Sequence, residues 1–441
     1  MMAHKRPRRF DFAVVGAGAA GLAGARLLSS GPGASVAIFE ARSRVGGRVW
    51  TRPVAGGIAE LGAEFIHGRD ERLFSEAESA GLPILRVADR HVELRGGAWK
   101  TLPRFWKRFD RLTRGIARVR RDRSVADYIA GRGAALSASD RRLLISMVEG
   151  FDAAPIGIAG ANAISTAGQP PMDAGERAQF RLAGGWGSYL DWMHAQLDPR
   201  LCRLLLATPV RRIAWSRGGA RLGTDAGEFR TRAVLVTLPV GVLQAPPGAK
   251  GSVRFDPDPP RLRRALAGLA MGDVVRLVLR FRNAFWGSAD SSRLARRRPA
   301  GEPTFFHVQG PEFPTWWTSS PVESSTLTMW AGGRAARSLL GLGRVEILRR
   351  ALATLASALG VAPAVVRRNL LGAESHDWSN DPYSKGAYSF ARVGGALAGR
   401  ALAQPFEGTL FFAGEAITTG EAGTVTAALE SGRRAATRML R

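Results

Sequence analysis

The stretch FDFAVVGAGAAGLAGARLL, residues 10–28, joins an apolar run to three closely spaced glycines and then to a run of small and apolar residues. The apolar run at 11–15 is typical of a short buried strand, and residues 19–28 are typical of a helix. A second apolar run, ASVAIFEAR at 34–42, carries an acidic residue near its end. The order strand, helix, strand predicts a βαβ unit that begins a doubly wound α/β sheet.

The glycines Gly16, Gly18 and Gly21 form a GxGxxG pattern between the strand and the helix. The first permits a tight turn, the second lets a pyrophosphate approach the backbone, and the third lets helix and strand pack closely. Glu40 follows at the end of the second strand, where its carboxylate can accept hydrogen bonds from both ribose hydroxyls and disfavours a 2′-phosphate. These residues predict an adenine dinucleotide site, and the competing interpretation is a plain glycine turn with a surface acid.

The amino-acid composition indicates which classes of protein are compatible with the sequence. A chain of 441 residues with 45% hydrophobic residues predicts a folded protein of two domains. We expect no transmembrane segment, no signal peptide and a cytoplasmic location. Cys202 is the only cysteine, which excludes intrachain disulfides and thiolate metal clusters, so no metal site is predicted.

The formal net charge of +26 attracts polyanions at long range and slows the approach of cationic ligands. Residues 104–123, RFWKRFDRLTRGIARVRRDR, are predicted to form a basic amphipathic helix. This helix is either a solvated cover of the second domain, which we favour, or a peripheral contact for an anionic membrane surface or an acidic partner. No specific nucleic-acid partner is predicted, and the oligomeric state stays open.

Further elements follow the first βαβ unit. Residues 208–240 alternate like a β-meander that returns to a buried strand, and residues 274–281 predict a longer strand. A helix is predicted at 344–359. The pattern of residues 408–418 again predicts a strand, a glycine turn and a helix.

Four later segments indicate which kind of dinucleotide the site would bind. They are EARSRVGGRVWT at 40–51, AELGAEFIHG at 59–68, WSNDPYSKGAYSF at 378–390 and FFAGE at 411–415. Together with GxGxxG, they make the chain resemble the flavin amine oxidase family, which includes monoamine oxidases, polyamine oxidases and flavin-dependent histone demethylases. The resemblance runs from about residue 11 to the end and is weaker in the middle.

The resemblance implies an α/β fold, with a Rossmann-like FAD-binding domain and an inserted substrate domain of mixed sheet and helices. The FAD-binding domain is expected at 10–86, 200–245 and 376–441, and the substrate-binding domain at 87–199 and 246–375.

The resemblance also gives roles to single residues. Glu40 would bind the adenosine ribose, Arg48 would lie beside the pyrophosphate and flavin, and Val210 would contact the adenine. Thr424 and Val425 would open a helix aimed at the flavin, where a helix N-terminus stabilises the negative charge of the reduced ring. The residues expected to bind cofactor are Gly16, Gly18, Ala19, Ala20, Gly21, Glu40, Ala41, Arg42, Gly46, Gly47, Arg48, Leu61, Gly62, Ala63, Glu64, Val210, Trp378, Gly414, Glu415, Thr424 and Val425.

The activity implied by the resemblance is the oxidation of a small amine. Hydride would pass from the α-carbon to flavin N5, giving an imine and, with molecular oxygen as acceptor, hydrogen peroxide. Monoamine oxidases tether the flavin through a cysteine before a site tyrosine, and this chain has Ala387 there, so FAD is expected to bind noncovalently.

Catalytic roles are expected for Arg276, Tyr388 and His67. Relatives usually have a lysine at the position of Arg276. Arginine can hold a water but cannot lose its proton near neutral pH, so a poor reaction with oxygen and a different electron acceptor are possible, as is a plain salt bridge. Tyr388 fits one wall of the aromatic pair that encloses the amine in relatives, and His67 resembles the polyamine oxidase branch. The residues expected to bind substrate are His67, Glu64, Tyr388, Thr424 and Glu421.

Two other functions stay open. One is a flavin dehydrogenase, desaturase or amino-acid oxidase of the same superfamily that reacts poorly with oxygen. The other is a polyanion-binding protein that keeps a structural flavin and uses the basic helix at 104–123.

Overall fold

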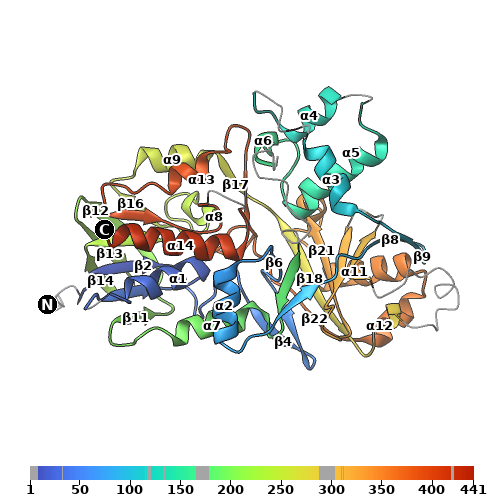
Figure 1. Cartoon of the computed structure of the whole chain (residues 1–441), viewed down its shortest axis with the longest axis horizontal. Coiled ribbons are helices and arrows are strands. Elements are labelled where there is room, and N and C mark those ends of the chain that lie inside the picture. The colour runs from blue at the N-terminus through green and yellow to red at the C-terminus, as the bar shows by residue number, and fades with distance from the viewer. Residues whose placement is uncertain are drawn as a thin grey trace. The chain divides into compact units, whose positions relative to one another are not determined.

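The computed structural model describes residues 8–31, 33–114, 116, 121–132, 135–164, 178–287, 303–308, 310, 312–418 and 422–441. The chain divides into two compact units (Figure 1). The first unit comprises Met1–Trp50, Trp186–Met271 and Trp378–Arg441, and the second comprises Thr51–Gly185 and Gly272–Asp377. The predicted α/β fold class is confirmed, and the assignment of cofactor and substrate to particular segments stays a prediction.

A parallel five-stranded sheet forms the centre of the first unit. Its strands are short apolar runs, and four of the five are almost wholly buried, as expected of a parallel sheet covered on both faces. The predicted strands around residues 11–15 and 34–42 and the predicted helix at 19–28 are confirmed. In spatial order the strands are β11 (Cys202–Leu205), β3 (Val36–Phe39), β2 (Phe12–Val15), β15 (Ala233–Val236) and β24 (Leu410–Phe412).

Two helices from opposite ends of the chain pack side by side next to this sheet. They are α1 (Ala19–Leu28) and α14 (Val425–Met439). Glycines permit the close approach: a Cβ on Gly432 would lie 2.1 Å from the carbonyl oxygen of Ala20. A Cβ on Gly21 would lie 1.9 Å from the carbonyl oxygen of Gly16, which gives the third glycine of the pattern its expected packing role.

A second sheet completes the first unit and contains the meander predicted at 208–240. Its middle strands are antiparallel neighbours in chain order. In spatial order the sheet comprises β1 (Arg8–Arg9), β14 (Gly227–Thr231), β13 (Gly219–Thr224), β12 (Val210–Ser216) and β16 (Arg254–Asp256). The remaining elements are α7 (Gly185–Ala195, which begins at the unit boundary), α8 (Val240–Leu243), α9 (Pro260–Ala267), β17 (Leu269–Met271), β23 (Ser389–Ala391) and α13 (Ala398–Leu402).

A seven-stranded mixed sheet forms the core of the second unit. The predicted strand at 274–281 and helix at 344–359 are confirmed, and that helix packs its apolar face into the sheet's core. In spatial order the strands are β22 (Leu370–Glu374), β18 (Val274–Phe281), β21 (Thr326–Gly332), β20 (Thr315–Thr318), β19 (Phe305–Val308), β8 (His91–Arg95) and β9 (Ala98–Thr101). The helix is α11 (Arg344–Leu359).

Smaller elements surround that sheet. The predicted basic helix at 104–123 appears as α3 (Phe105–Arg114); residues 115 and 117–120 lie outside the described residues. The other elements are β4 (Thr51–Val54), β5 (Gly57–Glu60), β6 (Ile66–His67), α2 (Glu71–Ser79), β7 (Ile84–Val87), α4 (Val125–Arg132), α5 (Ala138–Ser146), the π-helix η3 (Met147–Phe151), α6 (Ala161–Ile164), β10 (Gln179–Leu182), η4 (Phe285–Gly287), α10 (Gly333–Arg337) and α12 (Pro363–Asn369). Within the part of the chain that the structure describes, no helix has the length and apolarity needed to cross a bilayer.

The contact between α1 and α14 generates a stability prediction. Gly432→Ala forces a methyl group against the backbone of Ala20, so we expect the free energy of unfolding to fall by about 1–3 kcal/mol. Denaturant unfolding followed by circular dichroism measures this change. The matched control is Gly31→Ala, where a Cβ would meet no atom within 4 Å. Equal stability of the two variants would contradict the packing argument.

Candidate functional site

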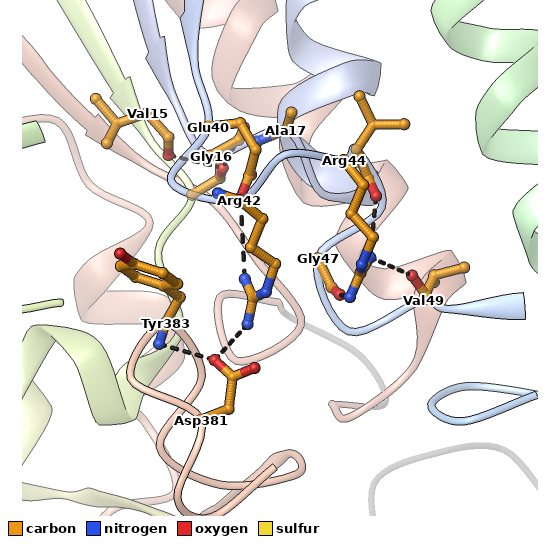
Figure 2. A network of polar contacts seen from close by, with 12 residues as sticks. Val15, Gly16, Ala17, Glu40, Arg42, Arg44, Gly47, Val49, Asp381 and Tyr383 are labelled. Atoms are coloured by element: carbon orange, nitrogen blue, oxygen red, sulfur yellow. Dashed lines mark hydrogen bonds and ion pairs between the residues drawn. The ribbon is translucent and has the colours of Figure 1, made fainter. Parts of the chain in front are cut away.

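The two glycine turns predicted from the sequence lie side by side in the first unit (Figure 2). Gly18 forms a parallel bridge with Gly46, whose N–H donates to the carbonyl of Ala17 at 2.9 Å. Gly16 has a φ of +108°, a conformation that favours glycine, and a Cβ there would lie 2.6 Å from Oγ1 of Thr237. Only glycine therefore fits the first turn.

The N-terminus of α1 is suited to an anion. Its N-cap is Gly18, which has no side chain to cap the helix, and no acidic residue lies in its first turn. The N–H groups and the positive end of the helix dipole are therefore not neutralised by a cap or an acid of the helix itself. This is the arrangement in which a helix N-terminus binds phosphate, so the residues present fit a dinucleotide.

The carboxylate of Glu40 holds the first glycine loop from the end of β3. It is 4% exposed, and its Oε2 accepts a hydrogen bond from the backbone N–H of Ala17 at 2.8 Å. Its Oε1 accepts from the backbone N–H of Arg42 at 2.9 Å. Because a carboxylate offers about four acceptor positions, Glu40 retains capacity for the two ribose hydroxyls. Its role in local structure was not predicted.

An ion pair joins the loop after β3 to the segment predicted at 378–390 (Figure 2). Nη2 of Arg42 lies 2.6 Å from Oδ1 of Asp381, and that same oxygen accepts the backbone N–H of Tyr383 at 2.8 Å. Two motifs that are more than 300 residues apart in sequence are thereby fixed to each other within the first unit.

Arg44 is a structural residue of the site that sequence reasoning missed. Its guanidinium donates to the carbonyls of Val49 at 3.1 Å and Gly47 at 2.9 Å (Figure 2). Its Cζ lies 4.4 Å from the ring centroid of Trp50. Burial and the charge of Arg42 lower the pKa of Arg44 to about 10, so it stays protonated at neutral pH. The available signal was an arginine two residues before the glycine pair Gly46–Gly47.

Arg48 and Glu415, which the resemblance placed at the cofactor, form an ion pair with each other. Nη1 of Arg48 lies 2.9 Å from Oε1 of Glu415 and also donates to the carbonyl of Ala387 at 2.9 Å. Oε2 of Glu415 accepts from Oγ of Ser389 at 2.7 Å. Each charge therefore has its partner within the first unit.

The expected N-cap of the C-terminal helix is present. Oγ1 of Thr424 accepts the backbone N–H of Ala427 at 3.1 Å at the start of α14. The preceding Gly423 lies close to Tyr388, since a Cβ built on it would be 3.5 Å from the tyrosine ring. Glu421 lies outside the described residues.

A buried cluster of charges lies in the second unit around Glu64. Its Oε1 lies 2.9 Å from Nη1 of Arg181, and its Oε2 accepts from Nε1 of Trp317 at 2.9 Å and from the guanidinium of Arg276. Arg276 also donates to the carbonyl of Gly62. Both arginines are buried, with Arg276 3% exposed and Arg181 6% exposed.

The surroundings of Arg181 shift its pKa in opposite directions. Burial lowers the pKa of Arg181, the nearby charge of Arg276 lowers it further, and Glu64 raises it. The carboxylate of Glu64 thus serves as the shared counter-ion of the two guanidinium groups. Arg181 was not predicted, because an arginine in the strand QFRL carries no motif of its own.

The predicted site residues fall into two groups, one in each unit. The group in the second unit comprises Leu61, Gly62, Ala63, Glu64, His67 and Arg276. The group in the first unit comprises Gly16, Gly18, Ala19, Ala20, Gly21, Glu40, Ala41, Arg42, Gly46, Gly47, Arg48, Val210, Trp378, Tyr388, Gly414, Glu415, Thr424 and Val425. Their roles toward cofactor and substrate stay predictions.

The fold is α/β and contains a glycine-loop site whose residues fit a dinucleotide, and a family model narrows the class of protein. The model described as flavin containing amine oxidoreductase matches residues 19–146 and 171–440. The chain therefore belongs to the flavin-containing amine oxidoreductase family.

Individual relatives are similar over almost the whole chain. The human protein "Lysine-specific histone demethylase 2" is 27% identical, covering 97% of this chain and 53% of its own. "Polyamine oxidase 1" of Oryza sativa subsp. japonica is 28% identical, covering 100% of this chain and 98% of its own. A solved structure of a putrescine oxidase double mutant has a TM-score of 0.80 at 21% identity, covering 98% of this chain and 99% of its own. The chain spans little more than half the length of the demethylase it matches.

The Glu64 cluster generates a stability prediction. Glu64→Gln removes the shared counter-ion of Arg181 and Arg276, so we expect the free energy of unfolding to fall by about 3–5 kcal/mol in a denaturant titration. The control is Glu71→Gln, which removes the exposed ion pair with Arg69 and should leave unfolding unchanged. Similar curves for both variants would contradict a buried, coupled cluster.

Proposed function

We propose that the protein is an FAD-dependent amine oxidase acting on a small amine. The observation that carries the proposal is the Gly18–Gly46 cradle with Glu40 beside it, in a chain of the flavin-containing amine oxidoreductase family. FAD, when bound, would accept a hydride at N5 from the α-carbon of the amine and pass the electrons to oxygen, giving an imine and hydrogen peroxide. The single cysteine favours a reducing compartment, and we include a cytoplasmic location in the proposal.

The first unit would hold the cofactor without a covalent bond. Glu40 would accept from the ribose hydroxyls, and the N-terminus of α1 would bind the pyrophosphate. The Thr424-capped N-terminus of α14 would stabilise negative charge on the reduced ring. Because Ala387 has no thiol, the flavin should be released when the protein is denatured.

The second unit would supply His67 and Arg276. A neutral imidazole at position 67 can accept a proton from a substrate ammonium, which keeps the amine in its reactive uncharged form. Glu64 is unsuited to that task, because both of its oxygens already accept from arginines. Arg276 can hold a polar group through its N–H donors but cannot shuttle a proton.

A dehydrogenase that reacts poorly with oxygen is the second candidate. The observation that favours it is the engagement of Arg276 with Glu64 and the carbonyl of Gly62. These two acceptors fix the orientation of the guanidinium, and an arginine, unlike a lysine, cannot give up a proton near neutral pH.

Anaerobic reduction tests the proposed function. The purified protein should show a flavin spectrum, an amine should bleach it without oxygen, and peroxide should form when air is readmitted. Heat denaturation should release FAD into the supernatant. A protein that stays colourless with excess FAD, or a flavin bleached by none of a panel of amines, amino acids and polyamines, would refute the assignment.

Arg276→Lys tests the choice of electron acceptor. A lysine can give up a proton and adopt more orientations, so we expect reoxidation of the reduced flavin by oxygen to become at least several-fold faster in stopped-flow measurements. The control is Arg181→Lys, which changes the other arginine of the same cluster. An unchanged rate in Arg276→Lys, or an equal gain in the control, would contradict the role of Arg276.

A further inference from the structure

The second sheet of the first unit has one buried face and one exposed face. Ile213, Leu222 and Phe229 are register partners across β12, β13 and β14, and all three lie in the hydrophobic core. Because side chains alternate along a strand, the residues next to them point to the other side of the sheet. Among the described residues of the five strands, no large hydrophobic side chain is exposed. The outer face is therefore polar.

Arginines occupy neighbouring positions on this outer face. Arg9 is the register partner of Arg230, and Arg230 is the register partner of Arg221, so three arginines lie side by side on β1, β14 and β13. Arg212 and Arg254 are register partners on β12 and β16. We call this set the arginine face; its members, all exposed, are Arg9, Arg212, Arg221, Arg230 and Arg254.

Two carboxylates lie on the same face, and each is paired with one of these arginines. Asp256 forms an ion pair with Arg212, and Oε1 of Glu228 lies 3.8 Å from Nε of Arg230. The hydrogen bond from Arg212 and the charges of two other arginines of the face hold the pKa of Asp256 below its usual range. Five arginines against two acids leave a formal excess of three positive charges.

Three members of the arginine face are left without a carboxylate. Within the part of the chain that the structure describes, the guanidinium groups of Arg9, Arg221 and Arg254 form no hydrogen bond or ion pair. Like charges directly opposite each other on neighbouring strands destabilise a sheet. Departures from such local rules are expected at functional sites. The row of arginines therefore points to a ligand that supplies negative charge.

The ligand that fits this face best carries closely spaced, fixed phosphates. Neighbouring strands are about 4.8 Å apart, so Arg9 and Arg221 stand about 10 Å apart across the sheet. Arginine binds phosphate through two parallel N–H donors. Duplex DNA carries one negative charge per about 1.7 Å of its axis, and binding to it without sequence preference needs phosphate contacts alone.

The polar character of the face disfavours two other polyanionic partners. A lasting membrane contact combines charge with an apolar anchor, and single-stranded nucleic acids stack their bases on aromatic side chains. Within the described residues, the outer face has neither kind of exposed side chain.

We propose that the arginine face binds the phosphate backbone of double-stranded DNA without sequence preference. This binding function is independent of the proposed amine oxidation, because no member of the arginine face is among the residues expected to bind cofactor or substrate. It also lies on the sheet of the first unit, not on the basic helix at 104–123.

Fluorescence anisotropy of a labelled DNA duplex tests the proposal with the full-length protein over a range of NaCl concentrations. The triple variant Arg9→Gln/Arg221→Gln/Arg254→Gln removes the three arginines that have no carboxylate. We expect its Kd to rise at least about tenfold, and the slope of log Kd against log salt to fall by about two to three. Because the substitutions remove repulsion, the midpoint of urea unfolding should not fall; a lower midpoint would contradict the like-charge argument.

A second triple variant controls for total charge. Arg203→Gln/Arg264→Gln/Arg400→Gln removes three exposed arginines from β11, α9 and α13 of the same unit. It should leave both the Kd and the salt slope nearly unchanged. An equal loss of affinity in the two triple variants would show that overall charge is responsible, and would overturn the proposal.

Three further results would also overturn it. The first is loss of DNA binding in Arg104→Gln/Lys107→Gln/Arg111→Gln with no loss in the arginine-face variant, which would place binding on α3. The second is binding to phosphatidylserine vesicles but not to DNA. The third is a strong preference between two duplexes of unrelated sequence. Anaerobic flavin reduction by an amine should be the same in the arginine-face variant and the unmodified protein, so the outcome of the DNA experiment does not depend on the proposed function.

Discussion

The hydrogen bond from the backbone N–H of Ala17 to the carboxylate of Glu40 is the contact on which the first unit's site depends. It ties the loop before α1, which turns at Gly16, to the end of β3, and the N-cap of α1 is Gly18, which has no side chain to cap the helix. The same carboxylate orients the loop that follows it through Arg42. One acid therefore fixes the backbone on both sides of the position where a nucleotide would lie.

In the second unit, one carboxylate binds two buried cationic side chains instead of backbone N–H groups. Burying Arg181 and Arg276 would be unfavourable without Glu64, and Glu64 is in turn committed to them. Such a cluster restricts the orientation of both guanidinium groups, because each is bound to Glu64. Through Arg276 it also holds the backbone carbonyl of Gly62.

Local patterns predicted most elements, but the helix expected within 408–418 is absent: the chain forms turns after β24, and α14 begins at Val425. The partners of charged side chains could not be predicted. Periodicity identified the strand at 274–281 and the helix at 344–359 with the bounds that the structure has. The roles of Arg44 and Arg181 were missed, because each depends on acceptors that only tertiary structure brings near. Of the helix predicted at 104–123, the structure describes α3 (Phe105–Arg114), and residues 121–123 are not helical; residues 115 and 117–120 lie outside the described part of the chain.

The central sheet of the first unit also constrains how the chain can fold. Its strand β15 pairs with β2 near one end of the sequence and with β24 near the other, and α14 packs on α1. Contacts of such large sequence separation form slowly, since each closes a long loop. During synthesis, β2 and α1 are made before β15, β24 and α14, so the apolar faces that they share stay exposed until these later elements have been made.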